Sequence, residues 1–256
     1  FKNSFIGSNL AAPLFKKWIR HCYRQGDVVI TPTEYSRELL MKYDLHREIY
    51  ALTNGVDTEF FHKTEQAGGQ FRVLFHIPVD KKVVISAGHL IRRKGILDFL
   101  ETARRMPDVL FLWFGGGNHA LIPEEIKRAV AEKPENVIFA GFVPSIILRD
   151  AYSGADAFAF FSYEETEGIV VLEALSCEIP VIIRDIPVYD EWLEDGVQVR
   201  KATDPDSYEQ ALREILSGER QEEVLRRTRA GRALAEEHSM KATGERLYQI
   251  EQNLYQ

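Results

Sequence analysis

Two glutamates with seven residues between them frame the segment of this chain that is richest in chemistry. Glu165 follows an apolar run that predicts a strand, and Glu173 lies more than one turn into the helix predicted next. Gly168, between them, lets the backbone approach a ligand and open that helix. Free N–H groups at a helix N-terminus favour phosphate, so the pattern fits a polyhydroxyl ligand that carries phosphate. The alternative is a solvated acidic turn formed by Glu164, Glu165 and Glu167. The apolar character of the helix around Glu173 argues against this alternative.

A second segment carries three adjacent cations, Arg92, Arg93 and Lys94, between another predicted strand and Gly95. Arg93 and Lys94 are suited to neutralise a leaving diphosphate, because negative charge builds there as a glycosidic bond breaks. An ordinary basic surface turn is the alternative, and the segment taken alone favours it equally.

Short apolar runs alternate with amphipathic stretches from about residue 82 onward. Strands are predicted over 83–88, 109–114, 137–140, 157–161 and 180–183, and helices over 95–105, 123–131, 146–153 and 168–177. Buried strands that alternate with helices predict an α/β fold with a doubly wound, parallel, Rossmann-like sheet. Ligands of such sheets bind at the carboxyl ends of the strands, so the loops after residues 88, 114, 141 and 161 are predicted to line the site.

The first sixty residues hold too few elements for a complete α/β domain. Helices are predicted over 13–24 and 33–41, and strands over 27–30 and 49–52. We therefore expect the tail of a preceding domain followed by a linker. From Asp204 to the C-terminus the pattern is almost entirely helical.

Composition narrows the functional classes. The chain has 256 residues, of which 45% are hydrophobic, so a sizeable core is expected. A formal net charge of -7 argues against nucleic acid as a general partner. Two distant cysteines, Cys22 and Cys177, fit a reducing cytoplasm better than a disulfide framework, and no spacing typical of a metal site occurs.

These segments, in this order, resemble the retaining glycosyltransferases of family four, which have the GT-B fold. The resemblance covers nearly the whole chain, and its strength lies in the ordered set of motifs. The matching segments are Asn54–Asp57 with Phe60, Gly88–Gly95, Phe114–Gly117, Gly141–Val143, the approach to the strand at Tyr152, Ala155, Asp156 and Phe158, Ser162, and the pair Glu165 and Glu173.

The resemblance implies a role for each matching position in a UDP-sugar donor site. Glu173 would hold the ribose hydroxyls, Glu165 the hydroxyls of the donor sugar, and Lys94 the diphosphate. Backbone amides of the helix start would lie near the diphosphate, and Glu165 and Lys94 would be the catalytic pair. The remaining donor-binding positions are Gly88, His89, Arg93, Phe142, Val143, Gly168, Ile169 and Val170. His89 departs from the family, which has arginine there; it is a weaker substitute or a residue that packs the loop.

The resemblance also implies an incomplete enzyme. The family needs no metal ion and no cofactor for donor binding, and its active site lies between two domains. Residues 1–62 would be a remnant of the N-terminal acceptor domain plus the interdomain linker. Residues 63–237 would form the donor domain, and residues 238–256 a helix that returns to the N-terminal domain. Because the chain starts at Phe1, most of the acceptor domain is expected to be missing, so the chain would bind donor without turnover.

The acceptor is suggested by the basic and aromatic stretch from Phe15 to Arg24. Such a helix is suited to an anionic membrane surface, and the overall pattern is most similar to bacterial enzymes that glucosylate diacylglycerol. A cytoplasmic, peripheral membrane enzyme that uses UDP-glucose is therefore expected. The alternative for this stretch is an ordinary helix that packs on the missing domain.

Three rival functions stay open at this point. The first is a transferase of the same family with a soluble or polysaccharide acceptor. The second is a nucleotide-sugar-binding module without catalysis. The third, a dinucleotide-dependent oxidoreductase, is disfavoured because Gly115-Gly116-Gly117 lacks the GxGxxG spacing and no acidic residue is placed as a ribose anchor.

Overall fold

The computed structural model describes residues 8–117 and 122–254, with side chains from residue 12 onward. Contacts divide the chain into two units, the first ending at Thr53 and the second beginning at Asn54. Residues 54–62, which the sequence analysis groups with residues 1–53, belong by their contacts to the second unit.

Within its described residues, 8–53, the first unit contains two helices and two parallel strands. They are α1 (Ser8–Tyr23), β1 (Val28–Thr31), α2 (Glu34–Met41) and β2 (Glu48–Ala51). The Thr33 side chain caps α2 by accepting a hydrogen bond from the Ser36 N–H. Helix α1 begins earlier than Pro13, which therefore lies inside the helix, where a proline removes one N–H donor from the ladder and crowds the carbonyl group four residues earlier.

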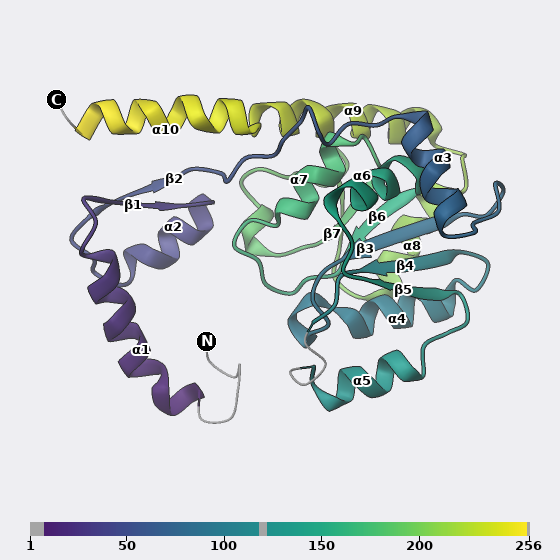
Figure 1. Cartoon of the computed structure of the whole chain (residues 1–256), viewed down its shortest axis with the longest axis horizontal. Coiled ribbons are helices and arrows are strands. Elements are labelled where there is room, and N and C mark those ends of the chain that lie inside the picture. Colours follow the sequence, from purple (N-terminus) through teal and green to yellow (C-terminus); the bar gives the residue numbers. More distant parts are fainter. Residues whose placement is uncertain (1–7, 118–121, 255–256) are drawn as a thin grey trace. The chain divides into compact units, whose positions relative to one another are not determined.

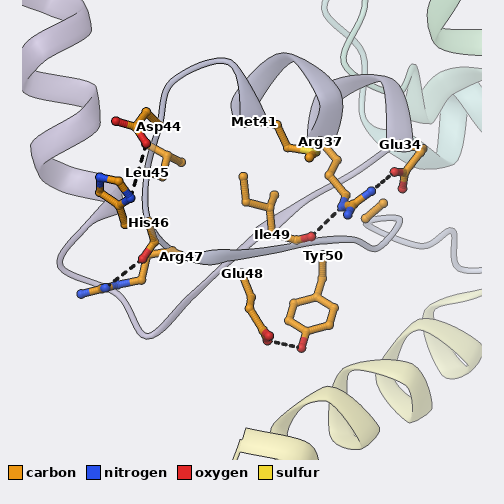
Figure 2. Close-up of a pocket in the computed structure, with 11 residues that line it drawn as sticks. Glu34, Arg37, Met41, Asp44, Leu45, His46, Arg47, Glu48, Ile49 and Tyr50 are labelled. Carbon is orange, nitrogen blue, oxygen red and sulfur yellow. Dashed lines mark hydrogen bonds and ion pairs between the residues drawn. The ribbon is translucent and has the colours of Figure 1, made fainter.

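An open cavity of about 630 Å³ lies beside α2 and β2 in this unit (Figure 2). Arg37 forms an ion pair with Glu34 and donates to the Ile49 carbonyl oxygen at 2.7 Å, and the Tyr50 hydroxyl donates to Glu48 at 2.6 Å. None of the residues predicted to bind the donor lines this cavity.

A parallel sheet forms the centre of the second unit, as predicted, and it has six strands rather than the five that the sequence indicates. Its strands are β3 (Val83–Ala87), β4 (Leu110–Phe114), β5 (Val137–Gly141), β6 (Ala157–Phe160), β7 (Val181–Arg184) and β8 (Arg200–Ala202). Their order is β5-β4-β3-β6-β7-β8, with every pair parallel. The chain moves outward in one direction from β3 and in the other from β6, so the strand order reverses between these two strands.

Helices cover both faces of the sheet (Figure 1). One layer contains α3 (Glu65–Leu74), α6 (Ser145–Gly154), α7 (Ile169–Ser176) and α9 (Gln221–Glu237). The other contains α4 (Ile96–Arg105), α5 (Glu124–Ala131) and α8 (Pro205–Leu216). Helix α10 (Met240–Leu254) follows α9, and none of its residues is buried. The sequence predicts these helices except α3.

Aromatic side chains dominate the core between the sheet and the layer of α4 and α8. The Phe99 ring lies edge-on to Phe111, Trp113 and Phe161 at centroid distances of 5.1–5.7 Å. Tyr208 of α8 stacks on Phe161 at 4.0 Å. These contacts hold α4 and the end of β6 against one another. The loops that carry Lys94 and Glu165 adjoin these two elements.

Gly95 joins the cationic segment to α4 under tight geometric constraint. Its φ is +74°, and a Cβ atom there would lie 2.1 Å from the Phe161 carbonyl oxygen. We expect Gly95→Ala to lower the free energy of unfolding by at least about 2 kcal/mol, because left-handed backbone strain adds to the clash. Urea unfolding would measure the loss. Gly69→Ala is the matched control: its Cβ would meet no atom within 4 Å, and in helix α3 it should stabilise the fold by about 0.5–1 kcal/mol.

Candidate functional site

The predicted cation and the first predicted carboxylate meet where the strand order reverses. Lys94 follows β3 and Glu165 follows β6, and these strands are hydrogen-bonded neighbours. The Lys94 ammonium forms an ion pair with Glu165 Oε1, and only 14% and 9% of the two side chains are exposed. A reversal of strand order creates the crevice in which open α/β sheets bind ligands. The structure thus gives these two residues the position that a ligand site requires.

Hydrogen bonds to backbone carbonyl oxygens hold together the two loops that carry Lys94 and Glu165. The Arg93 carbonyl oxygen accepts from the Tyr163 N–H at 2.8 Å and from the Ser162 hydroxyl at 3.3 Å. The Arg93 guanidinium bonds to the Glu164 carbonyl oxygen and lies 3.9 Å from Glu165 Oε2. Glu165 therefore faces two cations, and the acidic segment is no freely solvated turn.

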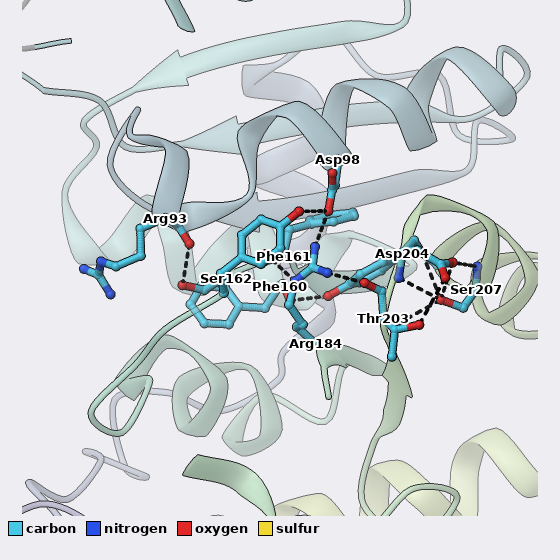
Figure 3. Close-up of polar contacts among 11 residues, drawn as sticks. Arg93, Asp98, Phe160, Phe161, Ser162, Arg184, Thr203, Asp204 and Ser207 are labelled. Atoms are coloured by element: carbon cyan, nitrogen blue, oxygen red, sulfur yellow. Dashed lines mark hydrogen bonds and ion pairs between the residues drawn. The ribbon is translucent and has the colours of Figure 1, made fainter. Parts of the chain in front are cut away.

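A buried arginine, Arg184, joins helix α4 to the loop that carries Glu165 (Figure 3). Arg184, at the end of β7, is 4% exposed; its Nε donates to the Phe161 carbonyl oxygen at 3.0 Å and its Nη2 donates to the Asp98 carboxylate of α4. Its guanidinium lies 3.9 Å from the centroid of the Tyr163 ring, whose hydroxyl donates to Asp98 at 2.6 Å. This cluster fixes α4 relative to the loop that carries Glu165.

Glycines let the next loops approach one another closely. The Trp113 indole N–H donates to the Gly88 carbonyl oxygen at 2.9 Å, and a Cβ on Gly115 would lie 2.3 Å from that oxygen. His89 Nδ1 lies 3.0 Å from the Gly116 carbonyl oxygen. This contact ties the His89 ring, which remains exposed, to the glycine turn.

The segment Gly141–Val143, which contains the predicted donor-binding residues Phe142 and Val143, lies at the end of β5. Its position is fixed by the Gly115 N–H, which donates to the Gly141 carbonyl oxygen at 2.7 Å. Phe142 follows with 90% of its surface exposed, and Val143 is partly exposed. An aromatic ring so exposed beside a ligand crevice can stack on a planar base.

Helix α7 presents its N-terminus beside Glu165. Gly168 caps the helix with φ +85°, and Ile169 and Val170 form its partly exposed first turn. The N–H groups of a first turn have no partners within the helix, so they can bind an anion. A Cβ on Gly168 would lie 2.5 Å from the Tyr189 hydroxyl oxygen, which explains why glycine stands there.

Glu173 lies one turn further along α7, partly buried. Its Oε2 accepts from the Tyr152 hydroxyl at 3.3 Å, and the same hydroxyl donates to the Val170 carbonyl oxygen at 3.2 Å. Burial raises the pKa of Glu173 to about 7, against which the Tyr152 hydrogen bond works. The carboxylate is therefore poised to accept hydrogen bonds from a ligand's hydroxyl groups, which would favour its charged form.

The raised pKa of Glu173 makes stability depend on pH. Because the carboxyl group binds its proton more tightly in the fold than in the unfolded chain, its contribution is full below the unfolded pKa of 4.5 and is lost as pH rises through about 7. We expect the parent to lose about 2–3 kcal/mol relative to Glu173→Gln between about pH 5 and pH 8. Urea unfolding of both proteins at the two pH values measures this difference; parallel pH profiles would contradict it.

Two site residues escaped the sequence analysis. Glu167, expected at most in an acidic turn, is 3% exposed, and its carboxylate accepts hydrogen bonds from the Asn54 backbone N–H at 3.2 Å and from the Asn54 side-chain amide. The Tyr189 hydroxyl is buried against Gly168 and has no hydrogen-bond partner among the residues that the structure describes. Burial, with the nearby charges of Glu165 and Glu167, raises the pKa of Tyr189 well above its usual value.

Within residues 8–117 and 122–254, no three His, Cys, Asp or Glu side chains are grouped so that they could hold a metal ion. No helix among the described residues has both the length and the apolar character needed to cross a membrane.

Family comparisons match both units. The family described as "Glycosyl transferases group 1" matches residues 71–233, and "Glycosyltransferase Family 4" matches residues 4–60. The processive diacylglycerol alpha-glucosyltransferase of Acholeplasma laidlawii is 37% identical over 99% of this chain and 76% of its own length. The alpha-galactosylglucosyldiacylglycerol synthase of Streptococcus pneumoniae is 29% identical over 76% of this chain and 54% of its own length.

Solved structures share the fold at low sequence identity. Sucrose-phosphate synthase from Thermosynechococcus elongatus superposes with a TM-score of 0.82 at 20% identity, over 94% of this chain and 61% of its own. Anabaena HepE in complex with UDP-glucose gives a TM-score of 0.79 at 16% identity, over 93% of this chain and 67% of its own. This chain thus spans only part of the length of the proteins that it matches.

Proposed function

Since the chain belongs to the group 1 glycosyltransferases, with the GT-B fold, we propose that its second unit binds the nucleotide-sugar donor of a retaining hexosyltransferase. The donor is UDP-glucose, and the acceptor is the hydroxyl of diacylglycerol or of a glycolipid built on it. The names of the two relatives described above, which make glycosylated diacylglycerols, support this choice.

The observation that carries the proposal is the meeting of Lys94 and Glu165 at the reversal of strand order, beside the N-terminus of α7. A diphosphate placed there would meet the Lys94 ammonium, the Arg93 guanidinium and the free N–H groups of the helix. A sugar beyond it would meet Glu165. A ribose on the other side would meet Glu173, which lies one turn along the same helix.

The same geometry supports a mechanism in which the protein stabilises the leaving group. The bond between the sugar and the diphosphate breaks as the acceptor hydroxyl approaches, and negative charge develops on the diphosphate. Fixed positive groups in a site with little water are effective there because they need no reorganisation during the reaction. No side chain of the protein has to act as a nucleophile.

A membrane acceptor is supported by helix α1. Leu14 and Trp18 are 74% and 59% exposed, and Lys16, Lys17 and Arg20 are carried by the same helix. Exposed apolar side chains among cations favour an interface rich in anionic lipid. We therefore propose that the enzyme acts at the cytoplasmic face of a membrane as a peripheral protein.

Competition binding tests the choice of donor. The chain is loaded with radiolabelled UDP, and UDP-glucose, UDP-galactose and GDP-mannose are compared as competitors. UDP-glucose is expected to compete best and GDP-mannose least. If GDP-mannose competes best, the proposed base and sugar are wrong; if UDP itself is not bound, the donor-site proposal is wrong.

A further inference from the structure

The Lys94–Glu165 ion pair joins two groups that the proposed function assigns to different parts of the donor. Lys94 would bind the diphosphate and Glu165 the sugar, yet in the structure each is the other's partner. A ligand that engages either group must therefore compete with this ion pair.

The ion pair has little access to solvent, so water does not easily replace a lost partner. Only 14% of the Lys94 side chain and 9% of the Glu165 side chain are exposed. If Lys94 leaves, Glu165 keeps the Arg93 guanidinium at 3.9 Å, which is too long for a hydrogen bond. A buried charge that loses its partner is strongly destabilising.

The nucleotide sugar and the nucleoside diphosphate differ in the groups that they bring to the Glu165 carboxylate. A nucleoside diphosphate draws Lys94 away and leaves the Glu165 carboxylate beside added negative charge. A nucleotide sugar draws Lys94 in the same way, but its sugar hydroxyls donate hydrogen bonds to the carboxylate and replace the lost partner. With the nucleotide sugar, both Lys94 and Glu165 thus gain a new partner. With the nucleoside diphosphate, only Lys94 does.

We propose, on the basis of the proposed function, that Glu165 selects the intact nucleotide sugar over the nucleoside diphosphate by holding Lys94 until sugar hydroxyls take its place. The consequence is weak retention of the product once the sugar has been transferred. Glu165 then acts as a specificity-determining residue in addition to its contact with the sugar.

Calorimetric titration with UDP and with UDP-glucose tests this exchange in the parent and in Glu165→Gln. The variant keeps the shape of the side chain and removes its charge. It should bind UDP about tenfold tighter than the parent and UDP-glucose no tighter, so the preference for UDP-glucose should fall about tenfold. Simple repulsion by Glu165 is stronger for UDP than for UDP-glucose, because the terminal phosphate of UDP carries an additional negative charge near neutral pH. Repulsion would persist when Lys94 is removed, whereas an exchange of partners would not, so the Lys94→Met background described below separates the two.

Three further variants isolate the ion pair. Glu164→Gln makes the same change of charge at the exposed neighbouring residue and should leave the preference unchanged. In a Lys94→Met background, Glu165→Gln should no longer alter the preference, because the two substitutions act on one interaction. Glu165→Asp keeps the charge but shortens the side chain, so it should reduce the preference for UDP-glucose in part. It replaces Glu165→Gln as the test variant if Glu165→Gln does not fold.

The outcomes separate the inference from the proposed function. If both ligands bind and Glu165→Gln keeps the parent's preference, or binds UDP less tightly, the exchange of partners is wrong while the donor site stands. If the parent binds neither UDP nor UDP-glucose, the proposed function is wrong and the inference falls with it.

Discussion

Lys94→Met is expected to weaken binding of UDP-glucose roughly hundredfold, because a charge-assisted contact in a site with little water is lost. Methionine fills similar space, so the fold should be retained. The substitution also removes the ion-pair partner nearest to the Glu165 carboxylate and leaves the Arg93 guanidinium 3.9 Å away, and this poorly compensated charge opposes an arriving diphosphate. Calorimetric titration measures the loss.

Lys127→Met is the matched control for this prediction. Lys127 is a cation on α5 that pairs with Glu124 at 3.4 Å, and it is not among the residues of the candidate site. Its replacement should leave affinity unchanged. If Lys94→Met binds UDP-glucose as tightly as the parent, Lys94 does not contact the diphosphate.

Glu173→Ala is expected to weaken binding of UDP roughly 10- to 100-fold without unfolding the domain, because the ribose hydroxyls lose a charged acceptor. The fold should be at least as stable as the parent's near neutral pH, since burial of this carboxylate is unfavourable and raises its pKa to about 7. Calorimetry gives the affinity and urea unfolding the stability.

A modified ligand tests the assigned role of Glu173 more sharply. UDP with both ribose hydroxyls removed should bind the parent and Glu173→Ala with similar, weak affinity. Neither protein can then form the contact between the ribose hydroxyls and the carboxylate. Glu222→Ala, an exposed glutamate on α9, provides the control substitution. If Glu173→Ala still binds the hydroxylated nucleotide better than the modified one, the ribose contact lies elsewhere.

The sequence predicts the parallel sheet well because its strands are buried runs separated by amphipathic helices. It misses α3, in which the adjacent glycines 68 and 69 lower helix propensity. The structure supplies the reason for Gly68: a Cβ there would lie 2.8 Å from the Ser153 carbonyl oxygen of α6. It also misses β8, a three-residue strand at the edge of the sheet with too little apolar character to be noticed.

Within the candidate site, the sequence identifies the chemical groups but not their partners. Lys94 and Glu165 are recognisable by their types and their places after strands, whereas their direct ion pair requires the reversed strand order that only the structure gives. The contact of Asn54 with Glu167 joins residues that lie 113 positions apart. The Arg184 cluster likewise depends on β7, β6 and α4 being neighbours, which no local pattern encodes.

Calorimetric titration of the chain with UDP, UDP-glucose, GDP and NAD tests the central claim most directly. A nucleotide-sugar donor site with the proposed specificity predicts binding of UDP and UDP-glucose, with GDP weaker and NAD silent. Preference for GDP would keep the donor site and change its base. Binding of NAD with no response to the other three would contradict the account.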